Sequence, residues 1–274
     1  MCCTDVNTQC DDLQRQLVQS QQYADHLKRQ LYEKDDKLKQ LQQDLEKQIG
    51  EKNKLQDDYD SLQNEKNKLD VTVQELQDIL RDVEDKTITT RKMTMDPNTA
   101  NPRIVLSADN SVMCTSEEMQ NIPDHPGRFD TALAVLGMAG FSSGRHYWEV
   151  SVAGKLCYHL GMASESAPRR GAIGFSPTNG FWTIVLNKQG QYKAADRRAV
   201  IIPVKTQPVT LGILLDYKKG QISVYDSGTR SHMYSFVGQR FTDKIFPFIN
   251  FCVEDVESPT PIVAVTPGSV DWIQ

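Results

Sequence analysis

Proline, phenylalanine and tryptophan are absent before residue 93 of this 274-residue chain. Between residues 11 and 86 there is also a single glycine, while Leu, Gln, Lys, Asp and Glu dominate. Such a segment lacks both the residues that interrupt helices and the large aromatic side chains that fill globular cores, so it favours one long helix. The break in composition predicts a tail over 1–10, a helical coil over 11–86, a linker over 87–92 and a globular domain over 93–274.

Long apolar runs and basic faces are missing as well. No stretch of about 18 apolar residues is present, as a membrane-spanning helix requires, and the N-terminus does not resemble a secretory signal. We therefore expect a cytoplasmic chain. Residues 11–86 carry 13 basic and 19 acidic side chains, and residues 87–274 carry 18 and 16. Neither part has the concentrated positive charge of a phosphate-backbone binder, so nucleic acid is not an expected partner.

Cysteine is sparse and scattered. The six cysteines have neither the spacing of a zinc site nor that of a disulfide framework; they are Cys2, Cys3, Cys10, Cys114, Cys157 and Cys252. We expect reduced thiols, as in most cytosolic proteins, and neither a metal nor a cofactor. Acylation of Cys2 and Cys3 as a membrane tether is an alternative, although no polybasic flank accompanies these residues.

Apolar residues recur with alternating spacings of four and three from Leu13 to Val83. With Leu13 at heptad position d, 16 of the 21 a and d positions are apolar, a pattern typical of a left-handed coiled coil. A lone helix cannot cover this stripe, so we expect a homodimer or higher oligomer formed through residues 13–83. Lys52 and Lys66 leave charged layers in the seam, and the parallel and antiparallel orientations both stay open. The leucines expected to carry the contact are Leu17, Leu31, Leu38, Leu45, Leu55, Leu62, Leu69 and Leu76.

After Lys92 the pattern changes to short apolar or alternating runs separated by turn residues, which indicates strands. Lys218-Lys219-Gly220 is typical of a hairpin turn. Many strands at close spacing predict an all-β antiparallel sandwich of the jelly-roll type. The eight strands we expect lie over 146–152, 157–163, 180–186, 210–216, 221–226, 233–237, 246–252 and 262–266.

Several motifs in this region carry a family resemblance. Met95-Asp96-Pro97, followed by Arg103-Ile104-Val105-Leu106-Ser107, resembles the opening of a PRY segment, and Gly144-Arg145-His146-Tyr147-Trp148-Glu149-Val150 resembles the SPRY entry strand. Asn179-Gly180-Phe181-Trp182-Thr183 and Leu215-Asp216-Tyr217 are similar to later SPRY signatures. Residues from about 90 to 270 thus resemble the PRY–SPRY domain of tripartite-motif proteins and butyrophilins. The resemblance implies a non-enzymatic adaptor that recognises a protein or peptide through variable loops, in innate immune regulation.

Positions that match ligand contacts in the family form the candidate binding site. They are His159, Val185, Asn187, Tyr192, Lys193, Phe251 and Asp130. Two of them have a structural alternative, because His159 is also interpretable as a hydrogen-bonded structural imidazole and Val185 as a packing side chain. Val185 and Asn187 stand where some relatives present tryptophan, so the usual aromatic anchors of an interface are missing.

Basic side chains cluster between residues 169 and 198, where Asp196 is the single acid. The candidate anion-binding residues are Arg169, Arg170, Arg197 and Arg198. With the resemblance to butyrophilins, this cluster makes an intracellular sensor of a small anionic ligand the alternative function. Asp130 at the edge of that region disfavours an anion.

Two patterns bear on enzymatic activity. Gly140-Phe141-Ser142-Ser143-Gly144 fits the G-x-S-x-G pattern of hydrolases, but that motif works at a strand-to-helix elbow and here it precedes a strand. A RING, the catalytic module of tripartite-motif ubiquitin ligases, needs eight Cys or His zinc ligands. Residues before 92 supply only Cys2, Cys3, Cys10 and His26. We therefore predict no enzymatic activity; a RING-less form of a tripartite-motif ubiquitin ligase is a further alternative.

Overall fold

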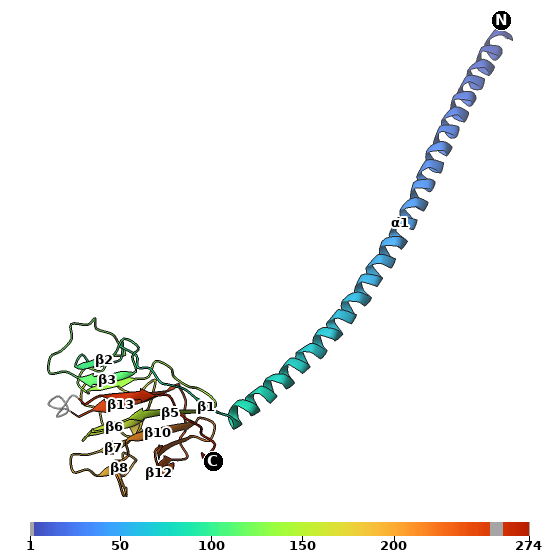
Figure 1. The fold of residues 1–274 in the computed structure, drawn as a ribbon. Coiled ribbons are helices and arrows are strands. Elements are labelled where there is room, and N and C mark those ends of the chain that lie inside the picture. Colours follow the sequence, from blue (N-terminus) through green and yellow to red (C-terminus); the bar gives the residue numbers. More distant parts are fainter. Residues whose placement is uncertain (1–2, 253–259, 274) are drawn as a thin grey trace. The chain divides into compact units, whose positions relative to one another are not determined.

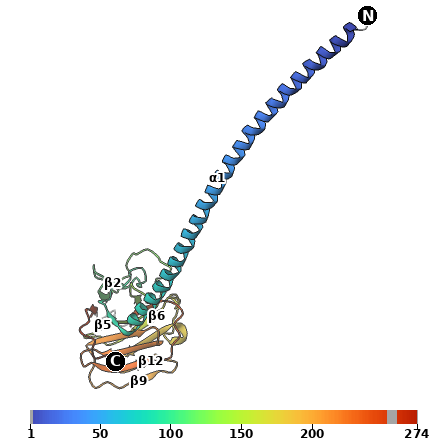
Figure 2. The ribbon, with the colours of Figure 1, turned by 90° about the vertical axis from the view of Figure 1, so that its right-hand side faces the viewer.

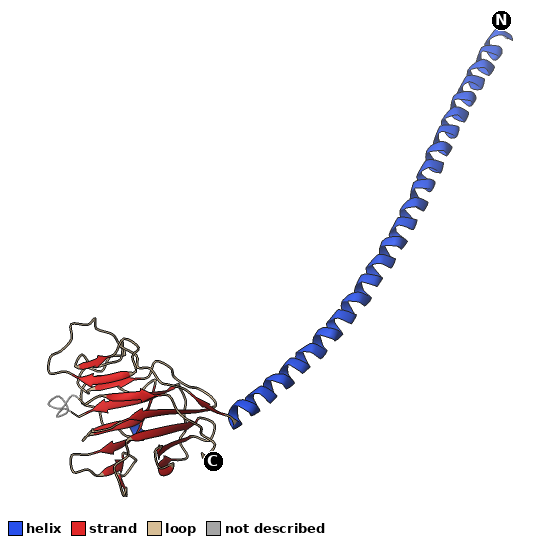
Figure 3. Ribbon diagram, viewed as in Figure 1, coloured by secondary structure: helices blue, strands red, loops and turns tan. Residues whose placement is uncertain are grey.

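The structure is a computed structural model that describes residues 3–252 and 260–273, apart from the side chains of residues 3–9, 84 and 85. The chain divides into two compact units, residues 1–76 and 77–274. The first unit is helical, and the second holds the end of the helix and the β-structure (Figures 1 and 3). The side chains of Cys2 and Cys3, the candidates for acylation, lie outside the described residues.

Residues Cys3–Lys86 form one α-helix, α1, of 84 residues. Its length follows from the absence of proline and from the abundance of strong helix formers. Ion pairs one turn apart support it, such as Lys39 Nζ to Asp35 Oδ2 at 2.9 Å, although each exposed pair contributes only a few tenths of a kcal/mol. The helix ends at Lys86, where the composition changes, but it begins earlier than expected, so most of the predicted tail over 1–10 is helical.

The apolar seam of α1 is exposed along the helix. The exposed fraction of its leucine, tyrosine and valine side chains ranges from 45% at Leu27 and Val73 to 70% at Leu31 and Leu55. Removing one such side chain from water contributes about 1.5–3 kcal/mol. A stripe of this length therefore carries a large driving force for association.

Two sheets follow the helix in the described part of the chain (Figures 1 and 2). The larger consists of β1 (Ile88–Thr90), β2 (Ile104–Leu106), β3 (Val112–Thr115), β5 (Arg145–Ser151), β10 (Thr210–Asp216), β11 (Gln221–Asp226), β12 (Ser231–Phe236) and β14 (Ile262–Val265). Its order is β12-β11-β10-β5-β14-β3-β2, and β1 pairs with β5 in parallel. All other pairs in this sheet are antiparallel.

The smaller sheet has six strands in the order β4-β13-β6-β7-β8-β9, all antiparallel. They are β4 (Ala134–Leu136), β6 (Tyr158–Ser164), β7 (Phe181–Leu186), β8 (Tyr192–Ala194), β9 (Val200–Ile202) and β13 (Ile245–Phe251). A short 3-10 helix, η1 (Pro177–Asn179), precedes β7 and ends at Gly180, whose φ of 79° favours glycine.

One apolar core lies between the two sheets. Leu160 of β6 and Ile184 of β7 meet Trp148 of β5 and Ile213 of β10 there, and each is exposed by 2% or less. Alternate residues of the strands other than β1 point into this core, as expected for packed sheets. A second apolar cluster covers part of the opposite face of the six-stranded sheet; its largest members are Phe129, Phe181 and Phe248.

The predicted fold class, a long helix followed by an antiparallel β-sandwich, is confirmed. All eight predicted strands are present, with ends that differ by two residues or less. Strands β1, β2, β3, β4, β8 and β9 were not predicted, because each has only three or four residues and alternation needs a longer run to be visible. One of them, β1, lies within the expected linker over 87–92.

Cys157 and Cys252 form a disulfide bond at the paired ends of β6 and β13. The register sets Tyr158 opposite Phe251, so the two cysteines, one residue further along, have Cα atoms 5.7 Å apart, a separation that suits a disulfide. The expectation that all thiols are reduced is therefore wrong for this pair. Cys10 and Cys114 are free.

Loss of this bond should destabilise the β-sandwich. The disulfide joins residues 95 positions apart, and cross-links of that span contribute about 2–4 kcal/mol to the free energy of unfolding. We expect this loss in the double variant Cys157→Ser/Cys252→Ser and in the wild-type chain under dithiothreitol. Urea denaturation followed by tryptophan fluorescence measures it, with Cys10→Ser as the control. A midpoint that does not respond to dithiothreitol would contradict the bond.

Candidate functional site

A row of side chains crosses the outer face of the six-stranded sheet. The register places Asn250 of β13 opposite His159 of β6, and His159 opposite Val185 of β7. Val185 in turn lies opposite Lys193 of β8, which lies opposite Ile201 of β9. Residues directly opposite each other in antiparallel strands share a face. These five residues, which we call the outer row, are therefore neighbours on one face.

The outer row points away from the core because its neighbours in sequence point into it. Leu160 follows His159 in β6, and Ile184 precedes Val185 in β7. Both are fully buried. Within the row, Asn250 is 7% exposed and Ile201 is 60% exposed, and the three residues between them are partly exposed. The accessible part of the row therefore lies over β6, β7, β8 and β9.

His159 lies near the centre of the sheet in this row. Its ring packs edge-on against Phe175, with 5.0 Å between the ring centroids. Its Nδ1 atom has no hydrogen-bond partner among the described residues. Burial lowers the pKa of His159 from 6.5 to about 4, because the charged imidazolium loses hydration. At pH 7 the ring is neutral, so it offers a ligand an aromatic surface rather than a positive charge.

The structure brings three of the predicted contact residues together, namely His159, Val185 and Lys193. It corrects the prediction for Tyr192 and Phe251, whose side chains belong to the core.

Tyr192 is fully buried and its hydroxyl is hydrogen-bonded to that of Tyr158 at 2.6 Å. Phe251 is 1% exposed, and its ring centroid lies 5.1 Å from the Lys155 Nζ atom. Both residues point inward, because they occupy the opposite phase of the strand alternation from the outer row.

The two remaining predicted contacts organise loops. The Asn187 side-chain oxygen accepts hydrogen bonds from the backbone N–H groups of Gln189 and Gln191, which closes the turn between β7 and β8. Asp130 is exposed, and its carboxylate accepts the N–H of Gly171 at 2.8 Å. Neither residue belongs to the outer row, although Asn187 lies two positions from Val185.

Two of the four candidate anion-binding arginines already have partners. The Arg169 guanidinium donates to the backbone oxygens of Ser164, Glu165 and Ala167 and lies over the Phe129 ring, 5.1 Å from its centroid. Arg170 is paired with the Asp124 carboxylate at 3.3 Å.

Arg197 and Arg198 are exposed in the segment before β9. The basic cluster seen in the sequence is thus divided between loop stabilisation and solvent, and Arg169 is not available to an anion.

Sequence reasoning missed Asn250 and Ile201. Ile201 belongs to a three-residue edge strand, too short for its alternation to be visible. Asn250 is set beside His159 only by the pairing of β13 with β6, more than ninety residues apart in the chain. The only sequence signal near Ile201 was the basic pair Arg197-Arg198 shortly before it.

Nothing in the described residues assembles a catalytic site from the patterns considered. The segment Gly140–Gly144 is a loop that leads into β5, not a strand-to-helix elbow. Among the described residues, no group of three or more His, Cys, Asp or Glu side chains is placed to hold a metal ion. Within the same residues, no helix has a segment that is both long and apolar enough for a membrane span.

Two sheets around one core, antiparallel except for the β1–β5 pair, define a β-sandwich, and the partly exposed outer row lies on the outer face of one of them. Residues 93–141 match the family model of the SPRY-associated domain, and residues 145–259 match that of the SPRY domain. The crystal structure of the TRIM65 PSpry domain superimposes with a TM-score of 0.56 at 23% identity, over 69% of this chain and 95% of that one. This likeness shows the shared fold.

Curated relatives agree with the domain matches. The ovary form of nuclear factor 7 from Xenopus laevis is 39% identical over 163 residues, 60% of this chain and 27% of that protein. The E3 ubiquitin-protein ligase TRIM69 from Mus musculus is 37% identical over 181 residues, 64% of this chain and 35% of that protein. This chain thus spans roughly a third of the length of these relatives. It is a PRY–SPRY domain protein of the tripartite-motif and butyrophilin type, as its motifs indicated.

The low pKa of His159 makes the stability of the sandwich depend on pH. Between pH 6.5 and about 4 the unfolded chain binds a proton that the folded His159 does not. The free energy of unfolding should therefore be highest above pH 6.5 and decrease as the pH falls towards 4. The decrease is at most about 1.4 kcal/mol for each unit by which the folded pKa of His159 lies below the unfolded one. His159→Gln should flatten this part of the profile, measured by urea denaturation across the range. A His159→Gln profile that keeps the wild-type slope would contradict the assignment.

Proposed function

We propose that this chain is a non-enzymatic adaptor in which α1 joins copies of the chain and each PRY–SPRY domain recognises a protein or peptide. PRY–SPRY domains are protein-interaction domains. The observation that carries the proposal is the outer row, because it sets apolar side chains and a cation on an accessible face of a rigid sheet. Such a face suits recognition, since little ordering of the binding surface is required on association.

The chemistry of the row favours a particular kind of ligand. Val185 and Ile201 flank Lys193, and the exposed Arg197 and Arg198 lie just before β9. Apolar contacts give an interface its affinity, whereas complementary charge increases the association rate and selects the partner. We infer a ligand segment that carries an apolar side chain next to an acidic one.

The exposed seam of α1 supports the self-association that this proposal includes. The seam leucines are about half to two-thirds exposed on the helix, so covering them with a second copy is favourable. A paired helix carries two domains, and a ligand with two or more epitopes then binds more tightly than either site alone permits. Modest affinity at each outer row is therefore sufficient for an adaptor.

The setting we propose, from the family resemblance, is innate immune regulation in the cytoplasm. In that compartment glutathione favours reduced thiols, and Cys157 and Cys252 would then be unbonded neighbours at the paired ends of β6 and β13. The alternative of a small-anion sensor has less support, because Arg169 and Arg170 are engaged by carbonyls and a carboxylate.

Charging the seam should separate the copies. We expect the wild-type chain to measure as a dimer or larger by size-exclusion chromatography with light scattering, and Leu41→Lys/Leu62→Lys to measure near the chain mass of 31.0 kDa. Both leucines are at position d, where a buried charge is unfavourable. Gln43→Lys/Asn64→Lys adds the same charge at outward f positions and should remain associated. A monomeric wild-type chain at micromolar concentration would remove the oligomer from the proposal.

An acidic side chain in the outer row should abolish ligand capture. Val185→Asp places a carboxylate next to Lys193 and removes an apolar contact, and we expect about a tenfold or greater loss of partner recovery in proximity labelling. Val237→Asp makes the same change at a valine that is 62% exposed after β12, and it should recover the wild-type partners. Identical partner sets for wild type and Val185→Asp would show that the outer row is not the binding face.

A further inference from the structure

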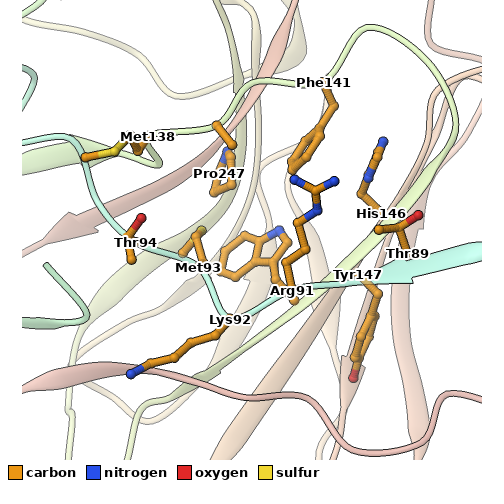
Figure 4. A pocket seen from close by; sticks show the side chains of 12 residues that line it. Thr89, Arg91, Lys92, Met93, Thr94, Met138, Phe141, His146, Tyr147 and Pro247 are labelled. Atoms are coloured by element: carbon orange, nitrogen blue, oxygen red, sulfur yellow. The ribbon is translucent and has the colours of Figure 1, made fainter. Parts of the chain in front are cut away.

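A small cavity lies beside the segment that follows β1, lined by residues other than those of the outer row. Its volume is about 250 Å³, and its apolar lining includes Met93, Met138, Phe141, Trp148 and Pro247. Figure 4 shows these surroundings from close by. The volume is just below the usual range of about 300–1,000 Å³ for small-molecule sites, so the ligand that fits is small.

Among the described residues, the charge that lines this cavity is positive. Arg91 and Lys92 are part of the lining, and no Asp or Glu of the described residues belongs to it. Lys92 is paired with Asp109 at 3.4 Å, whereas the Arg91 side chain has no hydrogen-bond or ion-pair partner among the described residues. In Figure 4, Arg91 extends towards Phe141 and His146, and Lys92 points the other way. The Arg91 guanidinium is thus available to a carboxylate, and this pair of groups commonly forms two parallel hydrogen bonds.

Trp148 supplies an unused donor in the same lining. Its indole N–H is buried and has no hydrogen-bond partner among the described residues, although buried donors are normally paired. The other two tryptophans do have acceptors, with Trp182 bonded to the Gln239 side chain and Trp272 to the Ser269 carbonyl, both at 2.9 Å. The nitrogen of Trp148 is covered in the structure, so a side chain of the lining must move before an acceptor reaches it.

Aromatic rings shape the cavity. Phe141 stacks on His146 with 4.0 Å between centroids and an interplanar angle of 17°, and the Nε2 atom of His146 lies 2.8 Å from the Ser143 carbonyl oxygen, which fixes the pair. Stacked rings favour a flat partner, and flexible methionines adapt to its outline. The lining therefore suits a planar ring better than a branched aliphatic group.

We propose that this cavity binds a small aromatic carboxylate. The ring lies among Met93, Met138 and Phe141, and the carboxylate accepts hydrogen bonds from the Arg91 guanidinium and the Trp148 indole N–H. An aromatic ring next to a carboxylate occurs in free aromatic acids and at the C-terminus of peptides that end with an aromatic residue. In the peptide, the rest of the chain must remain outside the cavity.

The three indole N–H groups provide the test. In a 1H–15N TROSY spectrum of the full, deuterated chain, each tryptophan contributes one side-chain signal, and Trp148→Phe assigns the signal of interest. We expect phenylacetate to shift the Trp148 signal downfield and saturably, and to leave those of Trp182 and Trp272 in place as internal controls. Phenylacetamide, which lacks the charge, should bind at least about tenfold more weakly. N-acetyl-phenylalanine and its amide repeat the comparison for a peptide C-terminus and identify the source.

Arg91→Ala should weaken phenylacetate binding at least about tenfold, whereas Lys92→Ala should change it less than about twofold. Unchanged Trp182 and Trp272 signals show that both variants are folded. The proposal is overturned if the Trp148 signal does not move at millimolar phenylacetate, if all three signals move together, or if Arg91→Ala binds as well as the wild type.

Discussion

Antiparallel register in the six-stranded sheet decides which side chains are available on the outside of the sandwich. The pairing of β13, β6, β7, β8 and β9 sets residues from distant parts of the chain into one row, and the same pairing directs their neighbours into the core. It also aligns Cys157 with Cys252 at the strand ends. A shift of one residue in any of these strands would exchange the two faces of that strand and turn its row residue towards the core.

Features that repeat over many residues could be predicted from the sequence, and features that depend on pairing could not. The heptads of α1 and most of the eight predicted strands gave periodic signals, whereas three-residue strands such as β9 did not. Motif similarity indicated which strands carry the candidate contacts but not which way each side chain points, so Tyr192 and Phe251 were predicted as contacts although they are core residues. The contact between Cys157 and Cys252 exists only after β6 and β13 have paired, so no local sequence pattern predicts it.

Charge in the loops is another case in which composition misleads. Arg169 appeared to belong to an anion site, but its guanidinium satisfies three backbone carbonyls. Arg128 is 7% exposed and does the same for Pro97, Ala100 and Pro123. Irregular backbone that covers a sheet leaves carbonyl oxygens without ladder partners, and arginine supplies several donors at once. A run of basic residues next to such loops is therefore as much a sign of covered backbone as of an anionic ligand.

The parallel pairing of β1 with β5 affects how this domain is best isolated. The matched SPRY-associated region starts at residue 93, but β1 ends at Thr90 and hydrogen-bonds to the Arg145–Tyr147 half of β5. A chain cut to begin at Met93 would uncover that half-strand and leave its backbone groups open to other molecules, a common origin of aggregation during expression. The unit that can be handled in solution is therefore longer than the homologous one, and its first residue belongs upstream of Ile88.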